Sequence, residues 1–332
     1  MKIPGFFIVI AALFFLGVVA MSCGGDDDDD SSESSGPTDD DADDDMDDDL
    51  NDDNDDDVND DIDDDAPPGP MSLRVMTWNI LFDFPDAEYD SWPLRREPEA
   101  EVINFHGSDL FGMQEPWYWQ VTDLQALCPD YDVARTPVNT DSTIFYRRDR
   151  FELIDQGNFW LSPHPERLSI GFGNFMPRFV IWVELYDNES RQQFFFFNTH
   201  FDNTNPFQEN AAPLYLEKIE EIAGDAPMVT TGDFNSKPDR EAYHILTEGI
   251  EPGGFALTNS FDLVEDFDIR LTPDDERQYD PSHRIDHIFI ANGNWDCSYW
   301  VVDMTRYGDP LRDPSDHFAM IADIELDAPD GR

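Results

Sequence analysis

The residues best suited to chemistry lie in the stretch Met228-Val229-Thr230-Thr231-Gly232-Asp233-Phe234-Asn235, where a short β-rich run ends in a carboxylate and a carboxamide two residues apart. Side chains two apart point to the same side of an extended backbone, so the spacing predicts that Asp233 and Asn235 face one site. Gly232 is expected to let the chain bend sharply as it leaves the strand. The same residues also suit an ordinary turn, so the interpretation depends on the rest of the chain.

Polar side chains of the same kinds follow other apolar runs. We expect each of them at the carboxyl end of a strand, where side chains project into a rim at which clefts form. These residues are Asn79, Glu115, His200, Asp286 and the pair Asp316-His317. Together with the stretch that ends at Asn235, they predict convergence on one site.

Local patterns predict how these residues are positioned. Strands are expected at 73–80, 109–115, 142–146, 151–154, 178–185, 193–199, 228–235, 284–290 and 318–324, and helices at 94–105, 121–127, 212–223 and 239–247. The strands 142–146 and 151–154 should pair with each other across a charged turn, and 178–185 should pair with 193–199. Locally paired strands with helices between them favour two sheets packed face to face, with helices outside each.

Six short motifs follow one another along the chain. They are Thr77-Trp78-Asn79-Ile80, Gln114-Glu115, Asn198-Thr199-His200, Gly232-Asp233-Phe234-Asn235, Ile285-Asp286-His287-Ile288-Phe289 and Ser315-Asp316-His317. Their types and order resemble the endonuclease/exonuclease/phosphatase superfamily, which includes DNase I-like nucleases, inositol polyphosphate 5-phosphatases and bacterial sphingomyelinases. Each motif alone is weak evidence for the family, but six motifs in the family's order are strong evidence. The resemblance covers residues 73–325 and implies a four-layer α/β/β/α sandwich, an α+β fold of two mixed, mostly antiparallel sheets flanked by helices.

The resemblance also implies a divalent cation. Glu115, assisted by Asn79 and Asp316, would hold Mg²⁺, with Mn²⁺ or Ca²⁺ as alternatives, because hard cations prefer oxygen ligands. Leu81 stands where some nucleases carry a further acid, so a cation site that relies on that position is not expected here.

By the same resemblance, His317 would be the general base toward a water molecule, oriented and made more basic by Asp286. Asp233 and Asn235 would contact the phosphoryl oxygens, and Asp233 would also position the nucleophile or protonate the leaving group. His200 would bind a nonbridging oxygen or assist the leaving group. These roles together would stabilise a phosphoryl transition state.

Three further positions are less specific. Arg178 is the best candidate for a cationic clamp on the substrate phosphate, although a surface arginine would look the same. His287 alternates with Asp286 along a strand and is expected to be a structural neighbour rather than a ligand. The tryptophans and tyrosine at 117–119 either line the substrate rim or belong to the core.

The amino-terminal residues predict export. Met1-Lys2, an apolar run to Met21 and small residues around Cys23 are typical of a signal peptide, which we place at residues 1–23. Cys23 lies in an imperfect lipobox, with Ala20 in place of the usual leucine, and is the predicted lipidation site. We expect a protein of the cell envelope, anchored by lipid to the outer or inner membrane or displayed at the cell surface. The alternatives are that Cys23 merely lies near an ordinary cleavage site, or that the apolar run stays as an uncleaved anchor.

Residues 24–70 are predicted to be a disordered spacer. They hold 25 of the 74 acidic residues and none of the 20 basic ones, so they repel one another and cannot bury a core. Residues 71–332 form the predicted catalytic domain and are also acidic, which disfavours a nucleic-acid backbone as substrate without excluding it. Whether Cys128 and Cys297 form a disulfide stays open.

The sequence thus predicts a metal-dependent phosphoesterase, expected to be a monomer, that hydrolyses a phosphodiester or a phosphomonoester. The phosphoester substrate, whether nucleic acid, phospholipid or sugar phosphate, is left open. The alternative is a surface binding protein on a degenerate scaffold, with the Asp-rich spacer as a calcium-binding stalk.

Overall fold

The computed structural model describes residues 67–84, 89–134, 137–138, 140–204 and 206–329, all of which belong to the compact unit Asp63–Arg332. The predicted signal peptide, Cys23 and the spacer as far as Ala66 lie outside the described residues. Just before the first strand, the main-chain N–H of Gly69 donates to the carbonyl of Ser190 at 2.9 Å. The last residues of the predicted spacer therefore contact the domain.

Thirteen strands of the described chain form two sheets. Sheet A contains, in spatial order, β10 (Asp268–Arg270), β12 (Trp295–Asp303), β13 (Ala319–Leu326), β1 (Met71–Asn79), β2 (Leu110–Trp117), β4 (Thr140–Arg147) and β3 (Tyr131–Val133). Sheet B contains β5 (Phe151–Trp160), β6 (Phe179–Asp187), β7 (Gln192–His200), β8 (Met228–Asp233), β11 (Asp286–Ala291) and β9 (Thr258–Asn259). Most neighbours are antiparallel, and the parallel pairs are β1 with β2, β10 with β12, and β7 with β8.

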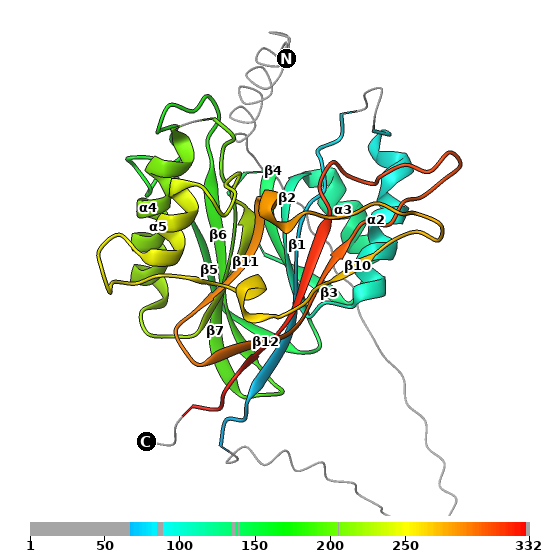
Figure 1. The fold of residues 1–332 in the computed structure, drawn as a ribbon. Coiled ribbons are helices and arrows are strands. Elements are labelled where there is room, and N and C mark those ends of the chain that lie inside the picture. Colours follow the sequence, from blue (N-terminus) through cyan, green and yellow to red (C-terminus); the bar gives the residue numbers. More distant parts are fainter. Residues whose placement is uncertain (1–66, 85–88, 135–136, 139, 205, 330–332) are drawn as a thin grey trace, which may run out of the picture. The chain divides into compact units, whose positions relative to one another are not determined.

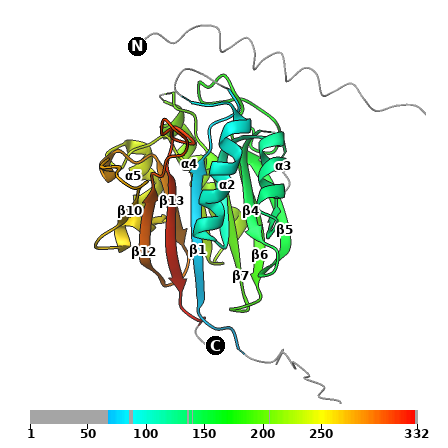
Figure 2. The ribbon, with the colours of Figure 1, turned by 90° about the vertical axis from the view of Figure 1, so that its right-hand side faces the viewer.

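Helices cover the outer faces of the two sheets. Helices α2 (Trp92–His106) and α3 (Tyr118–Leu127) lie across sheet A, and α4 (Phe207–Ala223) and α5 (Glu241–Glu248) lie across sheet B (Figures 1 and 2). The buried side chains accordingly form three clusters, one under each helix pair and one between the sheets. Two short 3₁₀ helices, Ser260–Leu263 and Pro281–His283, lie in the connections. The predicted four-layer α/β/β/α sandwich is confirmed.

The two sheets approach each other most closely at a glycine. A Cβ atom on Gly112 of β2 would collide with the side chains of Thr231 and Asn198, which belong to sheet B. A glycine inside a strand often marks such a close approach of another chain segment. Gly112 therefore allows the polar contacts that join the sheets.

Asn198 of β7 makes those contacts. Its Nδ2 donates to the main-chain oxygens of Met113 at 2.9 Å and Thr143 at 2.8 Å, both in sheet A. Its Oδ1 accepts from Nε2 of Gln114 at 2.7 Å. The side chain is fully buried and both of its polar atoms are hydrogen-bonded, which favours one relative position of the parts that it joins. The register between the sheets is thus specified by hydrogen bonds as well as by apolar packing.

One predicted pairing is wrong. The strands predicted at 142–146 and 151–154 do not form a hairpin, because β4 pairs with β2 and β3 in sheet A, whereas β5 pairs with β6 in sheet B. The contacts of Arg150 account for the passage of the chain from sheet A to sheet B between β4 and β5. Its guanidinium contacts Asp109 at 2.9 Å and Asp187 at 2.9 Å, the first beside sheet A and the second at the end of β6. The charged segment between the strands therefore bridges two layers.

Other expectations agree with the structure. The hairpin predicted from 178–185 and 193–199 is β6 with β7. Strand β12 was not predicted, and it lies in sheet A between β13 and the edge strand β10. Cys128 and Cys297 are both buried and not bonded to each other; the first packs under α2 and α3 and the second between the sheets. No helix within the described ranges is long and apolar enough to span a membrane.

Replacing Gly112 by alanine should lower the free energy of unfolding by about 1–3 kcal/mol, because the added methyl group must push the two sheets apart. Urea unfolding measures the change. Gly69→Ala is the matched control, since a Cβ there meets nothing within 4 Å, and it should stay within about 0.5 kcal/mol of the wild type. Equal stability of Gly112→Ala and Gly69→Ala would contradict the close approach.

Candidate active site

The predicted site residues meet at one rim, at the upper ends of both sheets in Figure 1. Asn79 ends β1, and Glu115 lies near the end of β2 in sheet A. His200 ends β7 and Asp233 ends β8 in sheet B. Because the two sheets pack face to face, side chains from both reach the same place.

The prediction that all these residues end strands is wrong for three of them, Asp286, Asp316 and His317. Asp286 is the first residue of β11, and His317 precedes β13. They reach the same rim because β11 runs antiparallel to β8, with Asp286 opposite Asp233, and β13 runs antiparallel to β1. A single sequence shows where a strand begins and ends but not the direction in which it runs.

His317 lies between two carboxylates. Its Nδ1 is 2.8 Å from Oδ2 of Asp286, and its Nε2 is 3.7 Å from Oδ2 of Asp233. Burial alone would lower the pKa of His317, but Asp286 and then Asp233 and Asp316 outweigh it and raise this pKa well above 6.5. Burial and the charge of Asp286 raise the pKa of Asp233. Without a metal, Asp286 and Asp233 therefore favour the imidazolium form of His317.

Asp233 also anchors its surroundings. Its Oδ2 accepts from Nδ2 of Asn79 at 3.1 Å, a bond from sheet A to sheet B, and its Oδ1 accepts from the main-chain N–H of Asn235 at 2.9 Å. Asn235 has a φ of 48°, so the extended backbone that was assumed from Asp233 onward does not continue to Asn235. The side chain of Asn235 donates to the carbonyl of Phe201 at 2.8 Å. Asn235 thus closes the turn at this point of the rim.

The structure requires a glycine at position 232 for a different reason from the predicted bend. It lies within β8 and does not have a left-handed backbone. A Cβ atom there would lie 2.5 Å from the carbonyl oxygen of Thr199 in the neighbouring strand. The glycine permits close packing of β7 and β8 rather than a bend.

A second imidazole and carboxylate pair includes a residue that sequence reasoning missed. Nδ1 of His200 lies 3.0 Å from Oδ1 of Asp141, and its Nε2 lies 3.5 Å from Oδ2 of Asp233. Burial and Arg178 act to lower the pKa of His200, but Asp141 and Asp233 outweigh them, so the pKa is raised. Asp141 directly precedes a predicted strand, at the same kind of position as Asp286, and this was the available signal.

Arg178 lies at the same rim. Its guanidinium bonds to the Asp141 carboxylate and lies 3.5 Å from Oδ2 of Asp202. Its side chain is 15% exposed, so it is not an ordinary surface arginine. Burial alone would raise the pKa of Asp141, but Arg178 and then His200 lower it. An arginine held in place by two carboxylates stays charged and pre-oriented toward the site.

Glu115 and Asp316 offer the oxygen atoms that a divalent cation needs. Burial raises the pKa of Asp316, and repulsion from Glu115 adds to the rise. A cation between these acids would remove that repulsion. Asn79, the last residue of β1, has a side-chain oxygen that accepts from the N–H of Leu81 at 3.1 Å, and the N–H of the next residue, Phe82, donates to Oε2 of Glu115 at 3.3 Å. These three residues therefore fit a hard cation such as Mg²⁺.

Another group is compact enough for a metal. One ligand atom from each of Asp233, Asp286 and His317 lies within 4.8 Å of the others. A histidine must be deprotonated to bind a metal, whereas its carboxylate neighbours favour a protonated His317. The oxygen donors at Glu115 thus suit the cation better.

Buried contacts of Arg95 in α2 hold the loops of the rim. Its Nη1 donates to the carbonyl of Ile80 at 2.6 Å, just after β1, and to that of Pro314 at 2.8 Å, just before Ser315. Ser315 Oγ in turn donates to the carbonyl of Asn79 at 2.6 Å. Hydrogen bonds from Arg95 and Ser315 therefore join the segment after Asn79 to the segment before His317.

His287 is fully buried and points away from this cluster, as predicted. Its Nε2 faces the carbonyl of Ser236 at 2.9 Å, and its Nδ1 faces Nδ2 of Asn259 at 3.0 Å. Oδ1 of Asn259 accepts from the N–H of Phe261, which fixes the amide. Nδ1 must then accept a hydrogen bond, and the ring is neutral. Burial lowers the pKa of His287 to about 3.

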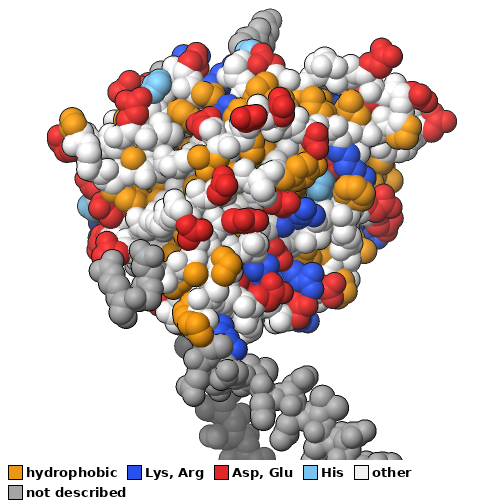
Figure 3. All heavy atoms as spheres, turned by 60° about the horizontal axis from the view of Figure 1, so that its bottom comes forward, with side chains coloured by type: hydrophobic (Ala, Val, Ile, Leu, Met, Phe, Trp, Pro, Cys, Tyr) orange, Lys and Arg blue, Asp and Glu red, His pale blue; other side chains and the backbone are white. Residues whose placement is uncertain are grey.

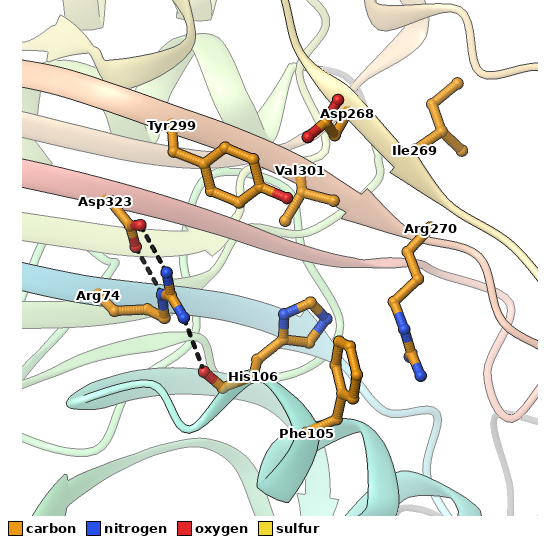
Figure 4. A pocket seen from close by; sticks show the side chains of 9 residues that line it. All are labelled: Arg74, Phe105, His106, Asp268, Ile269, Arg270, Tyr299, Val301 and Asp323. Carbon is orange, nitrogen blue, oxygen red and sulfur yellow. Dashed lines mark hydrogen bonds and ion pairs between the residues drawn. The ribbon is translucent and has the colours of Figure 1, made fainter.

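A surface hollow of about 580 Å³ lies elsewhere, between the end of α2 and strands β10 and β12 (Figure 4). Its charged side chains are already paired, Arg74 with Asp323 at 2.6 Å and Arg270 with Asp303 at 2.5 Å. Arg74 lies near the start of β1, whereas Asn79 ends that strand. The hollow is therefore separate from the rim where the titratable groups converge.

The sequence model of the Endonuclease/Exonuclease/phosphatase family matches residues 76–317. A solved endonuclease/exonuclease/phosphatase from Bacteroides vulgatus is 27% identical, with a TM-score of 0.67 over 77% of this chain and 100% of that one. A family protein from Bacteroides thetaiotaomicron is 27% identical, with a TM-score of 0.68 over 78% of this chain and 100% of that one. A mannosyl-6-phosphatase from Bacteroides thetaiotaomicron VPI-5482 is 26% identical, with a TM-score of 0.64 over 76% and 99%. No curated protein matches the sequence.

In metal-free protein, NMR titration of the His317 imidazole should give a pKa above 6.5. Asp286→Asn should lower that pKa, because it removes the charge that outweighs burial. A wild-type pKa at or below 6.5, or a pKa that does not move in Asp286→Asn, would show that the carboxylate does not control the ring.

His287 should make stability sensitive to acid. Below pH about 6.5 the unfolded chain binds a proton at this ring, whereas the folded chain does not until about pH 3. The stability of the wild type relative to His287→Gln should therefore fall as pH falls through this window, by up to about 1.4 kcal/mol per pH unit. Urea unfolding of both proteins at pH 7 and pH 5 measures the difference, and parallel curves would contradict a neutral buried His287.

Proposed function

We propose that this chain, which belongs to the endonuclease/exonuclease/phosphatase family, hydrolyses a phosphate ester by attack of a water molecule that His317 activates. The family consists of hydrolytic phosphoesterases that typically depend on a divalent metal. The observation that carries the proposal is the imidazole of His317 held at 2.8 Å from Asp286, with its other nitrogen toward Asp233.

Asp286 has the first task in the proposed reaction. Its Oδ2 accepts a hydrogen bond from the N–H group at Nδ1 of His317. The other ring nitrogen, Nε2, is then free of a proton and can take one from water. The carboxylate favours the charged imidazolium that results from this step. The water oxygen forms the new bond to phosphorus as the bond to the ester oxygen breaks.

The residues of sheet B would receive the phosphoryl group. Arg178, the imidazole of His200 and the side chain of Asn235 supply donors for its oxygens, and Asp233, whose pKa is raised, is a proton source for the departing oxygen. Donors that are fixed before the substrate arrives stabilise the developing charge without reorganisation. Burial of His200 and Asp233 supports this role, since electrostatic effects are stronger away from water.

Glu115, Asn79 and Asp316 would hold the cation, with Mg²⁺ as the proposed ion. When bound, the cation would polarise a phosphoryl oxygen and offset the negative charge of the reacting group. Asn79 joins the two groups of residues, because its Nδ2 donates to Asp233 and its main-chain oxygen accepts from Ser315, the neighbour of Asp316.

The charge of the protein bears on the substrate. The chain carries a net charge of −54 at pH 7. On the face that Figure 3 shows, which is the lower one in Figure 1 and not the rim, basic side chains lie among acidic ones. A long nucleic-acid backbone binds through an extended basic surface. A small phosphate ester, such as a sugar phosphate, fits this charge distribution better, and the likeness to a mannosyl-6-phosphatase supports testing that class.

Purified protein with Mg²⁺ should hydrolyse at least one of an aryl phosphate, a bis-aryl phosphate and mannose 6-phosphate. EDTA should abolish the activity, and His317→Ala should lower kcat by about 10²–10⁴-fold, because it removes the general base. His244→Ala is the matched control, since that exposed histidine on α5 pairs with Glu248 away from the rim, and it should keep wild-type activity.

Glu115→Gln should raise the Mg²⁺ concentration needed for half-maximal activity, since it removes one anionic ligand. If no phosphate ester, including RNA, DNA, phosphoinositides and sphingomyelin, is hydrolysed with any divalent ion, the proposal is overturned. A surface binding protein on the same scaffold would then be the better interpretation.

A further inference from the structure

Four aromatic side chains lie beside Glu115, on two loops of the rim. Phe82 and Phe84 follow β1, and Trp117 and Tyr118 lie where β2 meets α3. The rings of Phe82 and Trp117 are stacked, with centroids 6.1 Å apart and an interplanar angle of 17°. Phe84 lies against Phe82 at the same centroid distance. We call these four residues the aromatic rim.

The aromatic rim does not belong to the core. Phe84 is 41% exposed and Tyr118 is 57% exposed, and none of the four residues is part of the three buried apolar clusters or packs against them. Trp119, the next residue, does pack against the cluster under α2 and α3. Of the residues at 117–119, Trp119 is partly buried against this cluster, Trp117 contacts the ring of Trp119 edge-on with centroids 4.4 Å apart, and Tyr118 is exposed.

A buried glutamine holds the aromatic rim in place. Oε1 of Gln120 accepts from the main-chain N–H groups of Asp83 and Trp117, both at 3.1 Å, and its Nε2 donates to the carbonyl of Leu81 at 3.1 Å. One fully buried side chain thus fastens both loops to each other. Large aromatic rings presented on a rigid backbone lose little entropy when a ligand binds.

The aromatic rim also touches the proposed cation site. The N–H of Phe82 donates to Oε2 of Glu115 at 3.3 Å, and the N–H of the preceding Leu81 donates to Oδ1 of Asn79. A group attached to a phosphate at the site would therefore reach the rings over a few bonds.

We propose that the aromatic rim is the subsite for the leaving group and selects phosphate esters whose leaving group presents a ring face, such as a nucleobase or a pyranose. This proposal rests on the proposed function. Ring faces stack on aromatic side chains with little dependence on sequence or substituent. The acidic surroundings favour a neutral ring over a second anionic group, because like charges at the rim would repel it.

Calorimetric titration tests this with His317→Ala, which prevents turnover, in the presence of Mg²⁺. The probes are mannose 6-phosphate, adenosine 5′-phosphate and the ring-free glycerol 3-phosphate. At least one ring phosphate should bind about tenfold more tightly than glycerol 3-phosphate. Adding Trp117→Leu or Phe82→Leu should reduce that preference to about twofold or less, and the two ring probes distinguish a sugar from a nucleobase.

Phe105→Leu in the same background is the matched control, because Phe105 is an exposed aromatic residue beside the separate hollow of Figure 4, and it should keep the full preference. Thermal unfolding confirms that each variant is folded. The proposal is overturned if neither ring phosphate binds more tightly than glycerol 3-phosphate, or if the preference survives both substitutions. A ring preference in a protein whose wild type hydrolyses none of the esters would overturn only the proposed function.

Discussion

The site depends on how closely the two sheets approach each other. Asn79 bonds to Asp233, His200 to Asp141, and His317 to Asp286, and in each pair one residue comes from or next to sheet A and the other from sheet B. Neither sheet holds a complete pair by itself. A small change in the distance between the sheets would therefore weaken all three contacts together. Asn198, which bonds to two main-chain carbonyls of the other sheet, limits such a change.

The backbone at the rim is held in uncommon conformations. Leu81, Glu115, Asp141 and Asn235 all have a positive φ, between 48° and 91°, although none is a glycine. Such conformations cost free energy and persist where surrounding contacts enforce them. Here the enforcing contacts are identifiable, because Arg95 bonds to the carbonyl of Leu81 at 2.7 Å and the carboxylate of Asp233 caps the turn at Asn235. The rim is thus kept in shape by buried polar groups rather than by regular secondary structure.

Sequence reasoning was successful where the information is local. Residue order and short motifs identified the family, the two-sheet sandwich and most strands, and the hairpin of β6 and β7 has its turn in the predicted place. It failed where the information is spatial. The separation of β4 and β5 depends on Arg150 reaching Asp109 and Asp187, which are distant in sequence.

The same limit applies to the candidate site. Asp141 has no motif around it, and only the folded chain shows that its carboxylate meets both His200 and Arg178. Asn235 and Gly232 were given the wrong conformations, since a two-residue spacing predicts a shared face only if the strand continues. The strand ends after Asp233 instead, and the backbone of Asn235 turns back to that carboxylate.

The two described cysteines have a further consequence. They lie in different packing layers, and burial raises the pKa of the Cys128 thiol to about 11 and that of Cys297 to about 12. Thiolates are the species that exchange with disulfides and react with oxidants. The raised pKa values favour the protonated thiol over the thiolate at both positions at neutral pH. Burial and the raised pKa values therefore disfavour thiol–disulfide exchange at these two positions while the domain is folded.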